Sequence, residues 1–204
     1  MAHGPEPGTI LNESGVPTVP RQAATVIVLR GGSERLEVLL VQRTPKAKFM
    51  GGAWVFPGGA VDAHEGEGDV AHRAAAIREV SEETGITLPD PAALVPFARW
   101  ITPPEVSIRF DSYFFLAVAP DGAEAVVDGS EIVDARWFEP ARALEGSEAG
   151  EILMVFPTIK NLERVAEFDT ADALLEWAAK HEVKPVEPRV EGQGEAARIV
   201  IDDA

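Results

Sequence analysis

The sequence of 204 residues contains no cysteine. A chain without cysteine forms neither disulfides nor thiolate metal sites, so any metal that it binds must be held by nitrogen or oxygen ligands. The composition is compatible with a reducing compartment, and we expect a cytoplasmic protein. Residues 1–8 show neither the basic start nor the apolar run of a secretory signal.

Long apolar runs and positive charge are also scarce. No apolar stretch approaches the roughly 18 residues of a membrane span, so we expect no membrane partner. The chain has 18 Lys and Arg against 34 Asp and Glu, for a formal charge of −16. Nucleic-acid binding depends on basic surface, so this balance argues against a nucleic-acid partner. It does not exclude a small nucleotide substrate, because a bound cation reverses the local field.

The chain is rich in carboxylates on one predicted helix, residues 70–84, which ends at Gly85 as a left-handed stop. On a helical wheel, Glu79, Glu82 and Glu83 fall within roughly 100° of arc. The apolar or small residues of the helix cluster on the opposite side: Val70, Ala74, Ile77 and Ser81. Like charges four apart destabilise a helix by about 0.2–0.5 kcal/mol, which suggests a neutralising hard cation. A solvated acidic face is the alternative.

These glutamates belong to the motif Arg-Glu-apolar-x-Glu-Glu-x-Gly-apolar, which residues 78–86 match in full. The motif follows a short predicted strand that ends in Phe-Pro-Gly-Gly at residues 56–59. In this pattern the chain resembles the Nudix superfamily, hydrolases of nucleoside diphosphates linked to another moiety. The resemblance implies an α/β/α sandwich around a mixed sheet, with a loop–helix–loop that holds Mg²⁺ or Mn²⁺.

The resemblance also assigns roles to individual residues. It implies that Glu79, Glu82 and Glu83 bind the metal, with the carbonyl of Gly58 as a further ligand. Arg78 would orient the glutamates through charge-assisted hydrogen bonds. Glu82, Glu83 and Arg78 would then act in catalysis, as a metal-activated water attacks one phosphorus of the diphosphate.

The general base is open among several acids. Glu82 or Glu83 could accept the proton from the attacking water directly. Glu105 and Glu131 are candidates in loops outside the motif, and for these two residues an ordinary surface acid is the alternative.

One segment departs from the family motif. The usual motif has its first glycine fourteen positions before the arginine and a further glutamate eight positions before it. Here Gly59 lies nineteen positions before Arg78, and Val70 stands eight before it, so the segment is enlarged. Three acids in this segment could replace the missing glutamate: Glu65, Glu67, and Asp69, which is also a candidate N-cap.

Residues on both sides of the motif resemble a Nudix subgroup that includes the peroxisomal coenzyme A diphosphatases of animals. The shared features are a Phe-Met step at 49–50, the enlarged motif, Trp-Ile-Thr-Pro at 100–103 and Arg-Phe-Asp at 109–111. The resemblance implies CoA or acyl-CoA as substrate. The alternatives are a pyrophosphatase for ADP-ribose, dinucleotides or nucleoside triphosphates, and a non-catalytic ligand-binding module.

Seven residues are predicted to contact the substrate. The arginines among them would bind phosphate, and the aromatic residues would stack on an adenine or line an acyl groove. Surface charge and core packing are the respective alternatives. The predicted contacts are Arg43, Phe49, Trp54, Gly59, Trp100, Arg109 and Phe110.

Along the chain we predict a mobile arm at 1–20, one Nudix domain at 21–184 and a tail at 185–204, which could add a strand. The arm holds four prolines and three glycines. Many Nudix enzymes dimerise, so a homodimer is also expected by analogy. Strands are predicted at 23–30, 36–43, 54–56, 94–101, 110–119, 132–138 and 197–201, and further helices at 141–144, 158–166 and 170–181.

Overall fold

The computed structural model describes residues 12, 14–47, 50–127, 129–191 and 198–201. Phe49, a predicted substrate contact, lies outside the described residues, as does most of the predicted arm. Within the described ranges no helix has the combination of length and apolar character needed to cross a membrane.

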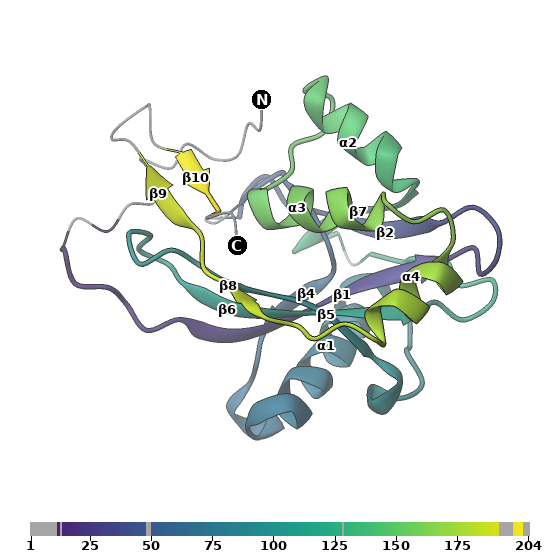
Figure 1. Cartoon of the computed structure of the whole chain (residues 1–204), viewed down its shortest axis with the longest axis horizontal. Helices are drawn as coiled ribbons and strands as arrows, with labels where there is room; N and C mark the ends of the chain where they lie inside the picture. The colour runs from purple at the N-terminus through teal and green to yellow at the C-terminus, as the bar shows by residue number, and fades with distance from the viewer. Residues whose placement is uncertain (1–11, 13, 48–49, 128, 192–197, 202–204) are drawn as a thin grey trace.

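A mixed sheet of eight strands, counted over the described residues, forms the centre of the fold (Figure 1). The strands are β1 (Arg21–Arg30), β2 (Glu37–Arg43), β3 (Trp54–Val55), β4 (Gly58–Ala60), β5 (Val95–Ile101), β6 (Phe110–Val118), β7 (Ile132–Phe138) and β8 (Pro185–Val186). Their order is β3-β2-β1-β6-β5-β8, with β4 beside β1 and β7 beside β2. The pairs β1–β6 and β5–β8 are parallel, and the predicted β1–β2 hairpin is antiparallel.

Strand β1 is apolar along most of its length because both of its faces are buried. Val26 and Val28 pack on one side of the sheet, whereas Ile27 and Leu29 pack on the other. Successive side chains of a strand point to opposite faces, so an unbroken apolar run is typical of a strand with a layer on each side.

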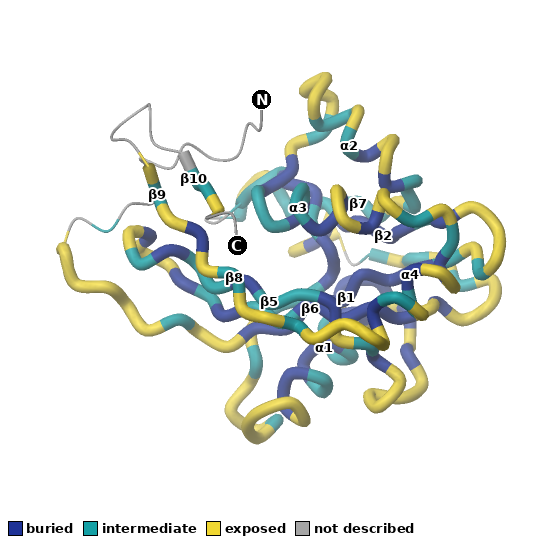
Figure 2. Tube along the Cα trace, viewed as in Figure 1, coloured by how far each residue is buried: buried dark blue, intermediate teal, exposed yellow. Residues whose placement is uncertain are grey.

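Helices cover both faces of the sheet, which confirms the predicted α/β/α sandwich (Figure 1). The helices are α1 (Gly68–Thr84), α2 (Pro140–Glu148), α3 (Phe156–Val165) and α4 (Ala171–Ala178), with short 3₁₀ turns at Ala63–Glu65 and Pro91–Ala93. Helix α1 packs on one face through Ala75, Ala76 and Val80. The other face packs against Leu162 of α3 and Leu174 of α4. Figure 2 shows the buried positions along the strands and the inner sides of the helices.

Helix α1 differs from its prediction in start and orientation. It begins at Gly68 and ends at Gly85, whose φ of 68° is left-handed as predicted. The position before the helix is Glu67, so the assignment of Asp69 as N-cap was wrong; Asp69 lies in the first turn. The predicted apolar side is not the buried one, since Val70 is 74% exposed. Alanines face the sheet instead, because their small side chains allow the close approach of a helix.

The segments on either side of the predicted domain also make contacts. The backbone N–H of Asn12 donates to the carbonyl of Glu105 at 2.6 Å, and the Thr18 hydroxyl donates to the carbonyl of Ser107 at 3.1 Å. The described part of the predicted arm therefore lies along the β5–β6 turn. In the tail, β8 adds to the sheet edge at β5, and β9 (Arg189–Glu191) pairs with β10 (Arg198–Val200). The mobility of the arm and the homodimer stay predictions.

Candidate active site

The two glycines of β4 place this strand in close contact with β1 and α1. A side chain on Gly58 would collide with the backbone of Ala24 and Thr25, and one on Gly59 would collide with the carboxylate of Glu79. Only a residue without a side chain fits at position 58, whereas a side chain at position 59 would displace the Glu79 carboxylate. The Pro-Gly-Gly step of the sequence therefore allows the motif helix to bring its carboxylates against the backbone of β4.

Buried Glu83 and half-buried Glu79 place their carboxyl groups at this contact. Glu83 is 7% exposed, and one of its carboxylate oxygens accepts a 3.0 Å hydrogen bond from the N–H of Gly58. Burial raises the pKa of Glu83 to about 8, against the opposing effect of the Gly58 bond, and nearby Glu79 raises it further. Burial also raises the pKa of Glu79. Two acids in this environment ionise readily only when a cation neutralises them.

The donor set fits a hard divalent cation, which prefers carboxylate oxygens. Among the described residues, however, no group of three or more acidic or histidine side chains converges as a ready-made cage. The side chain of Glu82 is 58% exposed and contacts Arg78. Of the three predicted metal ligands, the structure therefore pairs Glu79 with Glu83 and places Glu82 at the solvent edge. Gly58 contributes its N–H to Glu83, and a metal bond from its carbonyl stays a prediction.

Arg78 connects the carboxylates, and its orienting role in catalysis stays a prediction. Its Nη1 donates to Glu79 at 2.7 Å and to Glu82 at 2.9 Å. Its Nε donates to Glu65 at 3.0 Å, and its Nη2 donates to the carbonyl of Ala60 at 3.0 Å. The guanidinium thus ties helix α1 to β4 and to the enlarged segment of the motif.

Of the three acids that the sequence left open, Glu65 is the one that contacts Arg78. Its side chain is 5% exposed, and it accepts hydrogen bonds from Arg78 and from the backbone N–H of Asp62. Burial opposes ionisation of Glu65, but these bonds outweigh it and lower its pKa. Glu67 is exposed and Asp69 binds a different arginine. The Asp-x-x-Glu spacing from Asp62 to Glu65, a capping-box pattern, was the signal in the sequence.

Glu65→Gln is expected to weaken Mg²⁺ binding and turnover by about 10- to 100-fold, because partners that orient metal ligands typically contribute this much. The variant keeps its shape but loses the charge that holds Arg78 in place. Calorimetric Mg²⁺ titration and steady-state kinetics would measure the effect. Glu67→Gln, in the same segment but exposed, is the matched control. An equal loss in both variants would contradict the assignment.

Arg43 and Glu131 come together beside the carboxyl pair. Nη2 of Arg43 lies 3.3 Å from a carboxylate oxygen of Glu131. The charge of Arg43 lowers the pKa of Glu83, whereas the charge of Glu131 raises the pKa values of Glu79 and Glu83. The register of β2 and β7 shifts at Arg43, and such irregularities redirect side chains. The structure therefore brings one predicted phosphate ligand and one predicted base to the site.

Glu105 and Arg109 lie in a different setting. Glu105 is exposed in the β5–β6 turn. Arg109 is 8% exposed and donates through Nε to the Thr102 carbonyl at 2.9 Å and through Nη1 to the Thr18 carbonyl at 2.8 Å. Its Nη2 lies 2.9 Å from a carboxylate oxygen of Glu187. This guanidinium joins the arm, the turn and the tail, so its contacts are those of a structural residue.

The predicted stacking residues are mostly part of the core. Trp54 is 3% exposed and packs edge-to-face on Phe138, and Trp100 is 8% exposed and donates to Asn161 at 3.1 Å. Core packing, the alternative to stacking on an adenine, describes both tryptophans. Phe110 is half-buried at the start of β6, where its backbone N–H donates to a threonine hydroxyl at 3.0 Å.

The chain is similar in sequence to several named proteins. A Caenorhabditis elegans protein whose name places it among the nudix hydrolases is 26% identical over 72% of this chain, and the match spans 61% of the worm protein. The human acyl-coenzyme A diphosphatase NUDT19 is 23% identical, over 72% of this chain and 69% of its own length. A Bacillus subtilis relative named for 8-oxo-dGTP diphosphatase activity is 32% identical over 59% of this chain and 68% of its own length.

The fold also has relatives among solved structures. A NUDIX hydrolase from Alicyclobacillus acidocaldarius superimposes with a TM-score of 0.70 at 27% identity, over 78% of this chain and 96% of that one. The model of the NUDIX domain family matches residues 19–156, which is more than half of the sequence. The chain therefore belongs to the Nudix hydrolase family.

Proposed function

We propose that this protein hydrolyses the diphosphate bond of a nucleoside diphosphate linked to another moiety, with Mg²⁺ or Mn²⁺ as cofactor and CoA or acyl-CoA as substrate. The observation that carries the proposal is the carboxyl pair of Glu79 and Glu83, in which the Gly58 N–H bonds Glu83 and Arg78 bonds Glu79. Nudix hydrolases use divalent metals of this kind. The full motif argues against the alternative of a non-catalytic module.

Several residues of the chain would have separate roles in the reaction. A bound Mg²⁺ or Mn²⁺ supplies an acidified water and positive charge for the phosphate oxygens. Glu79 and Glu83 would hold this cation, and the Gly58 N–H fixes the orientation of Glu83. Arg78 holds Glu79 in place. Arg43 offers positive charge at the edge of the site, where a phosphate of the substrate would lie.

Glu131 is the better placed of the two general-base candidates outside the motif. Its charge raises the pKa values of both Glu79 and Glu83. Glu105 lies in the β5–β6 turn, where its backbone carbonyl accepts a hydrogen bond from the N–H of Asn12. A base must lie within hydrogen-bond reach of the water from which it accepts a proton. The position of Glu131 beside the carboxyl pair supports this role.

Glu131→Gln is expected to lower kcat by about 10²- to 10⁴-fold with little change in KM, because the variant binds substrate but no longer accepts the proton. Steady-state kinetics at saturating metal would measure this. Glu105→Gln serves as the matched control and should keep the activity of the parent protein. The reverse result, with the loss in Glu105→Gln, would show that the β5–β6 turn supplies the base.

The names of the relatives support two different substrates. NUDT19 is named for acyl-CoA, and the subgroup features of the sequence point the same way. The Bacillus relative is named for 8-oxo-dGTP, which favours a nucleoside triphosphate pyrophosphatase. Both activities would use the same carboxylates and differ in the contacts outside the motif.

A mass-spectrometric substrate panel tests the proposal. It includes CoA, acyl-CoAs, ADP-ribose, NADH, diadenosine polyphosphates and nucleoside triphosphates, each with Mg²⁺ and with Mn²⁺. Release of 3′,5′-ADP from CoA or acyl-CoA is the expected result. Formation of AMP from ADP-ribose or NADH, or of a nucleoside monophosphate from a triphosphate, would show that the substrate is not CoA. The proposed mechanism would be unchanged. A panel without turnover would overturn the hydrolase proposal in favour of a binding module.

A further inference from the structure

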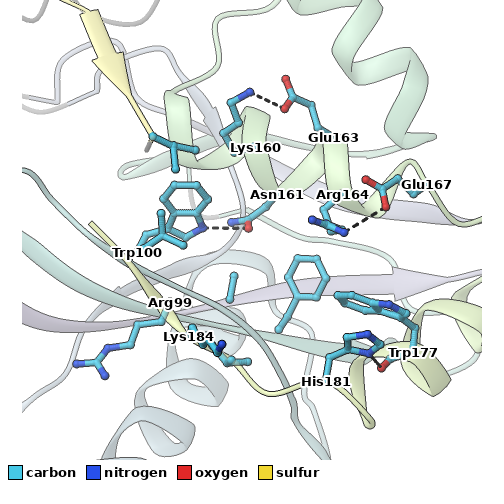
Figure 3. A pocket seen from close by; sticks show the side chains of 15 residues that line it. Arg99, Trp100, Lys160, Asn161, Glu163, Arg164, Glu167, Trp177, His181 and Lys184 are labelled. Carbon is cyan, nitrogen blue, oxygen red and sulfur yellow. Dashed lines mark hydrogen bonds and ion pairs between the residues drawn. The ribbon is translucent and has the colours of Figure 1, made fainter. Parts of the chain in front are cut away.

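A separate cavity of about 620 Å³ lies on the face of the sheet opposite α1 (Figure 3). It is bounded by β5, α3, α4 and the segment that leads into β8. None of the described residues that line it belongs to the site around Glu79 and Glu83. The volume is within the range of pockets that bind small organic molecules.

The lining combines apolar and polar side chains, and its apolar part offers no ready aromatic face. Phe97, Trp100 and Trp177 supply much of it. Trp177 already stacks on His181, with ring centroids 4.0 Å apart, and the Arg164 guanidinium lies 5.6 Å from its ring centroid. Trp100 is 8% exposed. A planar base would have to displace these neighbours, so the surface suits a flexible aliphatic group better than a nucleobase.

Four cations line the cavity beside the acids Glu163 and Glu167, and one of these cations, Arg99, is paired with Asp111 at 2.8 Å. Two cations of α3 have acidic partners one turn away: Lys160 pairs with Glu163 at 2.7 Å, and Arg164 pairs with Glu167 at 3.4 Å. The remaining lysine of the lining, Lys184, has no ion pair with any residue in the described ranges. One uncompensated cation favours a ligand with a single negative charge.

Asn161 adds a buried hydrogen-bond donor that is not satisfied. The residue is 2% exposed, and Figure 3 shows its side chain extending from α3 toward Trp100. Its Oδ1 accepts the bond from Trp100, an assignment that the indole N–H requires because it can only donate. Its Nδ2 is buried and has no partner within the described part of the chain. Such a group is stabilised by an acceptor oxygen of a ligand.

We propose that this cavity binds an aliphatic monocarboxylate of fatty-acid type, with its chain on the apolar lining and its carboxylate toward Lys184. Asn161 donates to an oxygen of the ligand. The site is independent of the diphosphate chemistry proposed for the other face, so neither result depends on the other.

Titration of the full chain with sodium octanoate tests the site, followed by calorimetry and by tryptophan fluorescence, without metal or nucleotide. We expect saturable binding with one site per chain. Lys184→Ala should weaken it at least 10-fold, and Ala98→Phe, which fills the cavity from β5, should abolish it. The uncharged analogue 1-octanol should bind the parent protein at least 10-fold more weakly than octanoate.

Lys180→Ala is the matched control, since this exposed lysine pairs with Glu176 and does not line the cavity. It should bind octanoate as the parent protein does, and so should Glu83→Gln. Thermal unfolding of each variant verifies that it is folded. No octanoate binding at millimolar concentration, or equal binding by Lys184→Ala, Ala98→Phe and Lys180→Ala, would overturn the proposal.

Discussion

Glu83→Gln is expected to lower metal-dependent hydrolysis by about 10³-fold or more. The carboxylate is buried, bonded to the Gly58 N–H and adjacent to Glu79, so a neutral amide there removes half of the pair proposed to hold the cation. A catalytic metal contributes several kcal/mol to the transition state, and each 1.4 kcal/mol corresponds to about tenfold in rate. Kinetics across a Mg²⁺ titration would separate weaker metal binding from slower turnover at saturation.

Glu82→Gln tests whether Glu82 contributes as much as Glu83, as the helical wheel suggests, or less, as its exposed position in the structure suggests. The wheel treats Glu79, Glu82 and Glu83 alike, but the Glu82 side chain is 58% exposed and contacts Arg78. We therefore expect a smaller loss in Glu82→Gln than in Glu83→Gln. Glu176→Gln, an exposed acid on α4, should have no effect. Activity retained by Glu83→Gln would refute the proposed metal site.

The metal-free protein should lose stability as the pH rises from about 5 to 9. Glu83 has a pKa of about 8 in the fold and 4.5 as its ordinary value, because burial disfavours its charge. An acid whose pKa is raised in the folded state contributes its full stabilisation at a pH below the pKa of the unfolded state. This contribution is lost as the pH rises through the pKa of the folded state. With about 1.4 kcal/mol for each pKa unit, the loss is on the order of a few kcal/mol.

Urea unfolding in the presence of EDTA at several pH values would measure this loss. Glu83→Gln lacks the titrating group, so its unfolding free energy should not fall for this reason. Above about pH 6 the variant should therefore gain stability relative to the parent protein. Mg²⁺ should restore the stability of the parent protein and have little effect on the variant. A constant difference across this pH range would show that Glu83 is ionised in the fold at neutral pH.

The main strands of the sheet could be read from the sequence. All six strands predicted upstream of the tail occur, with ends that differ by at most two residues, because apolar β-branched runs between turn residues are a strong local signal. The short strand β4 was not predicted as a strand. Its residues, Gly58–Ala60, have no intrinsic preference for a strand, and only the neighbouring β1 holds them in one.

The substrate contacts were harder to predict than the motif. Trp54 and Trp100 belong to the core, the alternative weighed for them in the sequence, and Arg109, also a predicted substrate contact, joins three chain segments. Arg43 and Glu131 do lie together, yet they are 88 residues apart in the chain. Whether a tryptophan or arginine faces a cavity or the core depends on long-range pairing, which leaves no local signal.

The sequence by itself determined the family, the motif helix with its left-handed Gly85, and the carboxylates available to a cation, because spacing along one helix sets which side chains share a face. Only the tertiary structure decided how that helix lies on the sheet. It buries Glu83 and leaves Val70 exposed, since alanines and the two glycines of β4 permit the closest approach there. The fold also brought Glu65, rather than Glu67 or Asp69, to Arg78, because the guanidinium pairs with the carboxylate that can reach it.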